Sequence, residues 1–132
     1  MNTEDLKKGF FVDDNVLKAR LETLVAKAQR HCKIDNQGHV MITDAKLSRK
    51  DQVMLTLAAR SIAAQVDPKI SAAVNVSEIA RSTGLAPNQV RARSTDFIKL
   101  RLVESPERGV YRAVPHKIEA FLDSLSREPA TE

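Results

Sequence analysis

The sequence predicts a mainly helical α+β domain with a small β-hairpin near its C-terminal end. Apolar residues recur at helical spacing in several separate stretches, and Gly84 and Pro87 punctuate the middle of the chain. Two short apolar runs, at 102–103 and 110–114, flank a polar turn and indicate the hairpin. A length of 132 residues suits one core with added N-terminal and C-terminal helices.

The density of Lys and Arg is highest in the middle segment of the chain. Lys and Arg number 12 against 9 Asp and Glu in residues 1–76, 7 against 4 in 77–112, and 2 against 4 in 113–132. The positive density of the middle segment suits a polyanionic partner once a fold places it on one surface. Because no apolar stretch approaches about 18 residues and Cys32 is the single cysteine, we expect a soluble cytoplasmic protein without membrane segments or intrachain disulfides.

Residues 1–44 are predicted to form an N-terminal helix and a connector. In the stretch Asp13–His31, Leu17, Leu21, Leu24 and Ala28 alternate steps of four and three and form an apolar seam. Two heptads are short for an independent coiled coil, so the seam packs either on a second copy, as a dimerisation segment, or on the same chain. The turn-forming run 35–38 then predicts a hairpin or an extended connector.

His31, Cys32 and His39 are the one candidate metal cluster in the sequence. A structural zinc site needs paired ligands such as CxxC, and none accompanies them. We therefore predict no metal and no cofactor.

A core helix is predicted from Ser48 to Val66. Ser48 and Asp51 have the spacing of an N-terminal cap, and Pro68 ends the run. The predicted packing face consists of Met54, Leu57, Ala58, Ser61, Ile62 and Val66.

A strand, two helices and a hairpin are predicted to follow. Val74–Val76 suits a short strand, Ser77 can cap a helix that turns Ile79 and Ala80 inward, and Gly84 permits a left-handed turn residue. Leu85 then fills the space between the two helices, the second of which runs from Pro87 to Leu100. We expect Val90, Phe97 and Ile98 to face the core, and Asn88, Gln89, Arg91, Ala92 and Thr95 to face outward.

The stretch 45–114 resembles the winged helix-turn-helix family of archaeal and bacterial transcription regulators. The matching residues are Glu78-Ile79-Ala80, Gly84-Leu85, Val90, Arg93, Phe97, Leu102-Val103 and Gly109-Val110-Tyr111-Arg112. The resemblance implies that helix 87–100 enters the DNA major groove and that the hairpin is a wing along the backbone or minor groove. Ser94 replaces a common leucine and Arg101 a common glycine, so loose packing and an altered helix exit are expected there.

The resemblance also implies roles for the outward side chains. Asn88 and Arg91 suit base edges, because asparagine pairs with adenine and arginine with guanine, whereas Ser77, Arg93, Arg108 and Arg112 suit phosphates. Gln89, Ala92 and Thr95 share the same predicted surface. Simple solvent exposure is the alternative for every one of these residues.

The last helix, 115–126, carries a stripe of Ile118, Phe121, Leu122 and Leu125, and residues 127–132 are predicted to be a flexible tail. Added helices often dimerise such regulators, so we expect a homodimer on double-stranded DNA.

Three other functions are less consistent with the sequence than DNA binding. The same framework also serves protein-interaction adaptors in larger assemblies, which is the leading alternative. An enzyme is not expected, because the sequence has no phosphate-binding glycine loop, nucleophile motif or carboxylate pair. Single-stranded RNA binding is not expected either, because with no Trp, one Tyr and four Phe the sequence offers few aromatic residues on which bases could stack.

Overall fold

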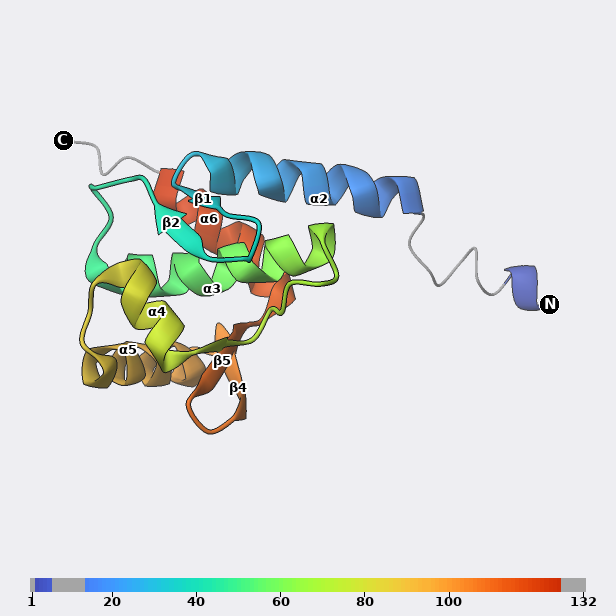
Figure 1. The fold of residues 1–132 in the computed structure, drawn as a ribbon. Coiled ribbons are helices and arrows are strands. Elements are labelled where there is room, and N and C mark those ends of the chain that lie inside the picture. The colour runs from blue at the N-terminus through green and yellow to red at the C-terminus, as the bar shows by residue number, and fades with distance from the viewer. Residues whose placement is uncertain (1, 6–13, 127–132) are drawn as a thin grey trace.

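A computed structural model describes residues 2–5 and 14–126, which form mainly helices with two small antiparallel sheets (Figure 1). Asp13 and the predicted flexible tail 127–132 lie outside the described residues. The elements are α2 (Asp14–Gln29), β1 (Cys32–Ile34), β2 (Val40–Ile42), α3 (Arg49–Val66), β3 (Val74–Asn75), α4 (Val76–Thr83), α5 (Pro87–Lys99), β4 (Val103–Glu107), β5 (Val110–Ala113), the 3-10 turn η1 (Pro115–Lys117) and α6 (Ile118–Ser126). The mainly helical α+β class predicted from sequence agrees with this order.

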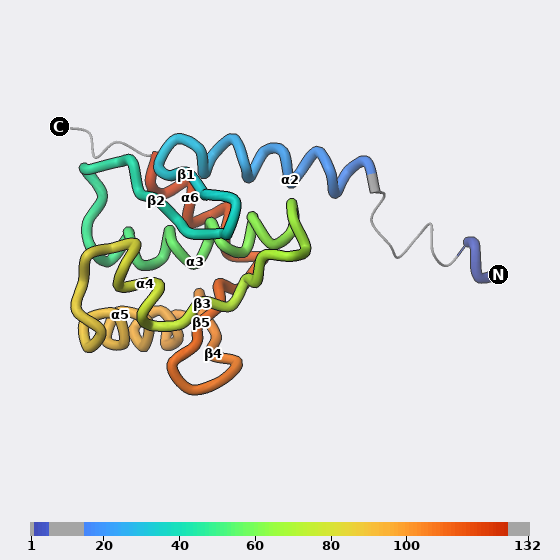
Figure 2. The backbone as a smooth tube through the Cα atoms, viewed as in Figure 1, coloured from blue at the N-terminus to red at the C-terminus, as the bar shows by residue number. Residues whose placement is uncertain are grey.

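Helix α3 is the central element of the fold. It lies between α2 on one side and α5 on the other (Figure 2), and every residue from Val53 to Ala63 is buried. Ser48 caps it as predicted, with its Oγ accepting from the Asp51 amide at 3.1 Å. Val66, predicted to pack in the core, is instead 60% exposed at the last position of α3.

Helices α2 and α6 cover the same side of α3. The predicted seam is divided, because Leu24 and Ala28 are buried whereas Leu17 is 48% exposed, and Val16 beside it, which was not part of the predicted seam, is 54% exposed. Lys27 Nζ lies 2.8 Å from Glu119 and 2.7 Å from Asp123, which ties α2 to α6. The C-terminal half of α2 therefore packs on its own chain, while its N-terminal half keeps an apolar stripe in solvent.

A tight β1–β2 hairpin connects α2 to α3. Cys32 pairs with Ile42, and Ile34 pairs with Val40. The Asp35 carboxylate accepts from the Gln37 and His39 amides at 2.9 Å each, which fixes the turn. Of the two predicted connectors, hairpin or extended segment, the hairpin is therefore confirmed.

The second sheet has the strand order β3-β5-β4. Val74 pairs with Tyr111, and Val103 pairs with Ala113, so β5 is the central strand. Helix α3, strand β3, helices α4 and α5 and the β4–β5 hairpin follow one another in the order expected for a winged helix-turn-helix, with which the fold is compatible. The predicted strand stops at Asn75, because Val76 already begins α4.

Two candidate features of the sequence can be placed in this fold. Among the described residues, no helix is long and apolar enough to cross a membrane. Within the same ranges, no three His, Cys, Asp or Glu side chains are grouped so that they can hold a metal ion. Instead, His31 Nδ1 lies 2.8 Å from Asp44, and His39 Nδ1 lies 3.2 Å from Asp35.

Candidate nucleic-acid interface

The turn between α4 and α5 is built by local backbone chemistry. Gly84 ends α4 in the left-handed region at φ 75°, and Pro87 starts α5 in its first turn, both as predicted. The predicted cap of α4 was wrong. Asn75, and not Ser77, accepts from the Glu78 amide at 2.9 Å, because α4 begins at Val76, two residues earlier than expected, and leaves Ser77 exposed within its first turn.

The inner face of α5 packs on the core through three residues. Val90, Ser94 and Phe97 are 0%, 0% and 3% exposed, at positions that lie one above another along the helix. Ile98, predicted to join them, is 36% exposed, because one further residue turns its side chain about 100° away from Phe97. The buried face of α5 is therefore narrower than predicted, because Ile98 lies largely outside it.

The outer face of α5 presents the predicted polar side chains to solvent. Asn88, Arg91, Ala92 and Thr95 are all exposed, and their spacing of three, four and seven residues places them on one stripe. Arg91 has no ion-pair partner among residues 2–5 and 14–126. Gln89 is also exposed, but its Oε1 accepts from the Ala86 amide at 3.1 Å and helps to cap the helix.

Two of the predicted phosphate-binding arginines already have acidic partners. Arg93 lies 3.3 Å from Asp96 one turn along α5, and Arg112 lies 2.6 Å from Glu104 across the β4–β5 ladder. All four side chains are between 42% and 48% exposed, so these pairs are weak and exchangeable.

The β4–β5 hairpin is longer and its tip is tighter than predicted. Strand β4 continues to Glu107, so the connection is only Arg108 and Gly109, with Gly109 in the left-handed region at φ 76°. The Ser105 Oγ lies 2.8 Å from the carbonyl oxygens of both Glu107 and Val110 and braces an irregular register. Arg108 is exposed at the tip, and β4 contacts α5.

No protein-family model and no curated protein matches the sequence. One solved structure that aligns with the chain is that of BpsR from Bordetella bronchiseptica, described in connection with the regulation of its DNA binding by 6-hydroxynicotinic acid. The two chains are 16% identical, the alignment covers 88% of this chain and 73% of that one, and the TM-score is 0.41. A likeness at this level identifies neither a family nor a function.

The two unusual residues noted in the sequence have clear structural effects. Arg101 adopts φ 62°, so an arginine occupies the left-handed conformation that glycine favours after a helix. Ser94 is fully buried, and no hydrogen-bond partner for its Oγ exists among the described residues. The expected altered exit is therefore not observed, because Arg101 takes the conformation that glycine would take, and the effect at Ser94 is an unbonded hydroxyl in a fully buried position.

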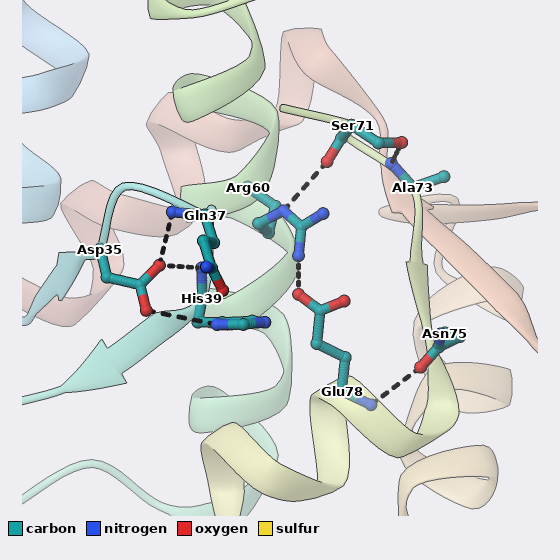
Figure 3. A network of polar contacts seen from close by, with 8 residues as sticks. All are labelled: Asp35, Gln37, His39, Arg60, Ser71, Ala73, Asn75 and Glu78. Carbon is teal, nitrogen blue, oxygen red and sulfur yellow. Dashed lines mark hydrogen bonds and ion pairs between the residues drawn. The ribbon is translucent and has the colours of Figure 1, made fainter. Parts of the chain in front are cut away.

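A network of polar contacts that sequence reasoning missed fixes α4 against the core (Figure 3). The Arg60 guanidinium forms an ion pair with Glu78 and donates through Nε to the Ser71 carbonyl at 3.0 Å. The sequence feature that could have predicted the network is Arg60 itself, a basic residue in the middle of an apolar helix. A buried charge is rarely tolerated without a partner, so an acidic partner could have been expected.

Basic side chains of α3 also reach the helix pair. Arg49 donates to the Thr83 carbonyl at the end of α4, and Lys50 Nζ lies 5.8 Å from the Phe97 ring centre of α5. The sequence shows Arg49 and Lys50 as two adjacent basic residues at the start of a helix. Their nearness to the α4–α5 turn could not be predicted, because it depends on tertiary packing.

Proposed function

We propose that this chain is a winged helix-turn-helix protein that binds double-stranded DNA as a transcriptional regulator. In this proposal α5 enters the major groove, and the tip between β4 and β5 lies along the backbone. The observation that carries it is the exposed stripe of Asn88, Arg91, Ala92 and Thr95 on a helix whose opposite face is held in the core. Short polar groups with an unpaired arginine suit the approach of a helix to base edges.

The contacts of each side chain suggest an order of importance. We infer that Asn88 and Arg91 read bases and that Arg108 binds a phosphate, because none of the three is held by an acidic partner within the described ranges. Arg93 and Arg112 must give up their ion pairs with carboxylates before they can bind phosphates, so each contributes less to DNA affinity than Arg91. Gln89 serves the helix cap first, and Ser77 has the least direct support.

The charge balance of the proposed surface also supports an anionic partner. Residues 86–112 contain six Lys and Arg against three Asp and Glu. Two of those acids, Asp96 and Glu104, are already paired with arginines, so they repel phosphate less than free carboxylates would.

A gel-shift titration with mixed genomic duplexes at two salt concentrations tests the proposal. Wild-type protein is expected to shift DNA at low salt and to bind more weakly at the higher salt. Arg91→Ala combined with Arg93→Ala should weaken the shift at least about tenfold, since each lost charged contact is worth about 1 kcal/mol or more. The matched control, Arg20→Ala with Arg30→Ala, removes the same charge from exposed positions on α2 and just after it, and should bind like wild type.

We further propose that two copies pair through the N-terminal half of α2. Val16 and Leu17 leave an apolar stripe in solvent that continues into the buried part of the seam at Leu24. A pair of α5 helices would then address a two-fold DNA site. Sedimentation should show a wild-type dimer and a Leu17→Glu monomer, whereas Met41→Glu, at a position 52% exposed elsewhere, should remain dimeric.

The adaptor alternative has one observation of its own. Ile98 and Leu100, at the end of α5, are large apolar side chains that are 36% and 58% exposed. If wild-type protein shifts no duplex even at low salt, these residues make protein binding the better account. If DNA is shifted, Ile98→Ser combined with Leu100→Ser should leave the shift unchanged.

A further inference from the structure

A cavity of about 670 Å³ lies between α2, β1 and the C-terminal half of α3. The 35–36 turn and residues 66–70 complete its walls. None of its lining residues comes from α4, α5 or strands β3 to β5, so it is separate from the proposed DNA surface. Its size is within the range of about 300–1,000 Å³ that is typical of sites for small molecules.

The walls of the cavity are mainly apolar. Val25 and Ala28 of α2 face Ala59, Ile62 and Ala63 of α3 across it. The small alanine side chains keep the space open, whereas longer side chains at these positions would have filled the gap between the helices. At the mouth, Val66 is 60% exposed, so an apolar side chain is left in water beside an apolar hollow.

Carboxylates dominate the charged rim. Asp35 and Asp67 are both anchored by backbone amides, from Gln37 and His39 in the first case and from Lys69 at 3.1 Å in the second. These amides hold the pKa of Asp35 below its usual range, so it is ionised at neutral pH. The remaining charged residue of the lining, Lys33, is exposed on β1, so the lining carries two carboxylates against one ammonium group.

We propose that this cavity binds a small, mainly apolar molecule that carries one cationic group. The apolar body lies between α2 and α3, and the cation lies at the mouth beside Asp67. The inference does not depend on DNA binding, because no residue is shared between the two surfaces.

Three probes with one apolar body and different charges test the proposal: 4-phenylbutylamine, 4-phenylbutan-1-ol and 4-phenylbutanoate. Each is titrated into the full chain, and backbone amide shifts are followed by ¹⁵N NMR. The amine is expected to give saturable shifts at Ala28, Cys32 and Ala63, and to bind at least about tenfold more tightly than the carboxylate. The alcohol should lie between them.

Two pairs of variants locate the binding. Val66→Trp should block the mouth and abolish the saturable shifts, whereas Met41→Trp, at a similarly exposed apolar position of β2 outside the cavity, should leave them intact. Asp67→Asn should weaken the binding of the amine about threefold to tenfold without changing the affinity for the alcohol, whereas Asp51→Asn should change neither affinity.

Absence of saturable shifts for all three probes would overturn the proposal, as would shifts that survive in the Val66→Trp variant. Tighter binding of the carboxylate than of the amine would overturn the charge assignment. If wild-type protein shifts DNA in the gel assay but shows no saturable binding of the probes, the proposed function is retained and only the cavity site is rejected.

Discussion

The Arg60 guanidinium and the Glu78 carboxylate form an ion pair that joins the centre of α3 to the first turn of α4. Arg60 is only 6% exposed, and its Nε also donates to the Ser71 carbonyl, so one side chain holds α4 and the connection that precedes it. Burial lowers the pKa of Arg60, although the guanidinium remains charged at any physiological pH. The Arg60–Glu78 pair therefore fixes α4, and through it the start of the α4–α5 unit, by a contact with the core helix α3.

Loss of this pair should destabilise the fold. Arg60→Leu leaves Glu78 largely buried without its partner, and we expect the free energy of unfolding in urea to fall by about 3 kcal/mol. Arg93→Leu, in the exposed pair with Asp96, should cost less than about 1 kcal/mol. Equal losses in the two variants would show that the buried pair has no special role.

The sequence was sufficient for elements whose signals are local. The Ser48 cap, the Gly84 turn and the Pro87 start all depend on backbone chemistry within a few residues, and each was predicted. The predictions for the cap of α4 and for the burial of Ile98 were wrong, because both depend on the register of a helix to within one or two residues.

Contacts between distant segments left weaker signals. Glu78 stands 18 residues after Arg60, and nothing local links them. The arginines of the proposed site were found by type and spacing, but their acidic partners were not, since Glu104 reaches Arg112 only across the hairpin.

Arg101→Gly should stabilise the protein. Arginine at φ 62° is strained because its Cβ crowds the backbone, and glycine removes that strain at some cost in chain entropy. We expect the free energy of unfolding to rise by about 1 kcal/mol in urea titrations. Lys99→Gly, one position inside α5, should lower it by a similar amount. A loss of stability in Arg101→Gly would contradict the strain.

Ser94→Ala should also increase stability, by about 1 kcal/mol. The Oγ is fully buried without a partner within the described residues, so removing it relieves desolvation, and alanine favours the helix. Thr83→Ala provides the contrast, because the buried Thr83 hydroxyl donates to the Ile79 carbonyl at 2.9 Å and its loss should destabilise. Thermal unfolding of both variants measures the difference, and a destabilised Ser94→Ala protein would indicate that the hydroxyl is bonded.

Cys32 should make stability fall in alkaline solution. Burial raises the pKa of its thiol from 9.0 to about 11, so the folded state keeps the proton after the unfolded state has lost it. This contribution is complete below about pH 9 and is lost between about pH 9 and about pH 11, by about 2–3 kcal/mol. Urea unfolding at several pH values should show a steeper decline in wild type than in Cys32→Ala, and parallel curves would contradict the shift.

The most direct test of the central claim is the salt dependence of DNA affinity, measured by fluorescence anisotropy of a labelled duplex between about 50 and about 200 mM salt. We predict that the magnitude of the logarithmic slope decreases by about 1 in Arg108→Ala, at the hairpin tip, where the arginine has no acidic partner among the described residues, and stays unchanged in Arg30→Ala, just after α2. Absence of binding at the lowest salt, or the same slope in all three proteins, would contradict a DNA interface formed by α5 and the β4–β5 hairpin.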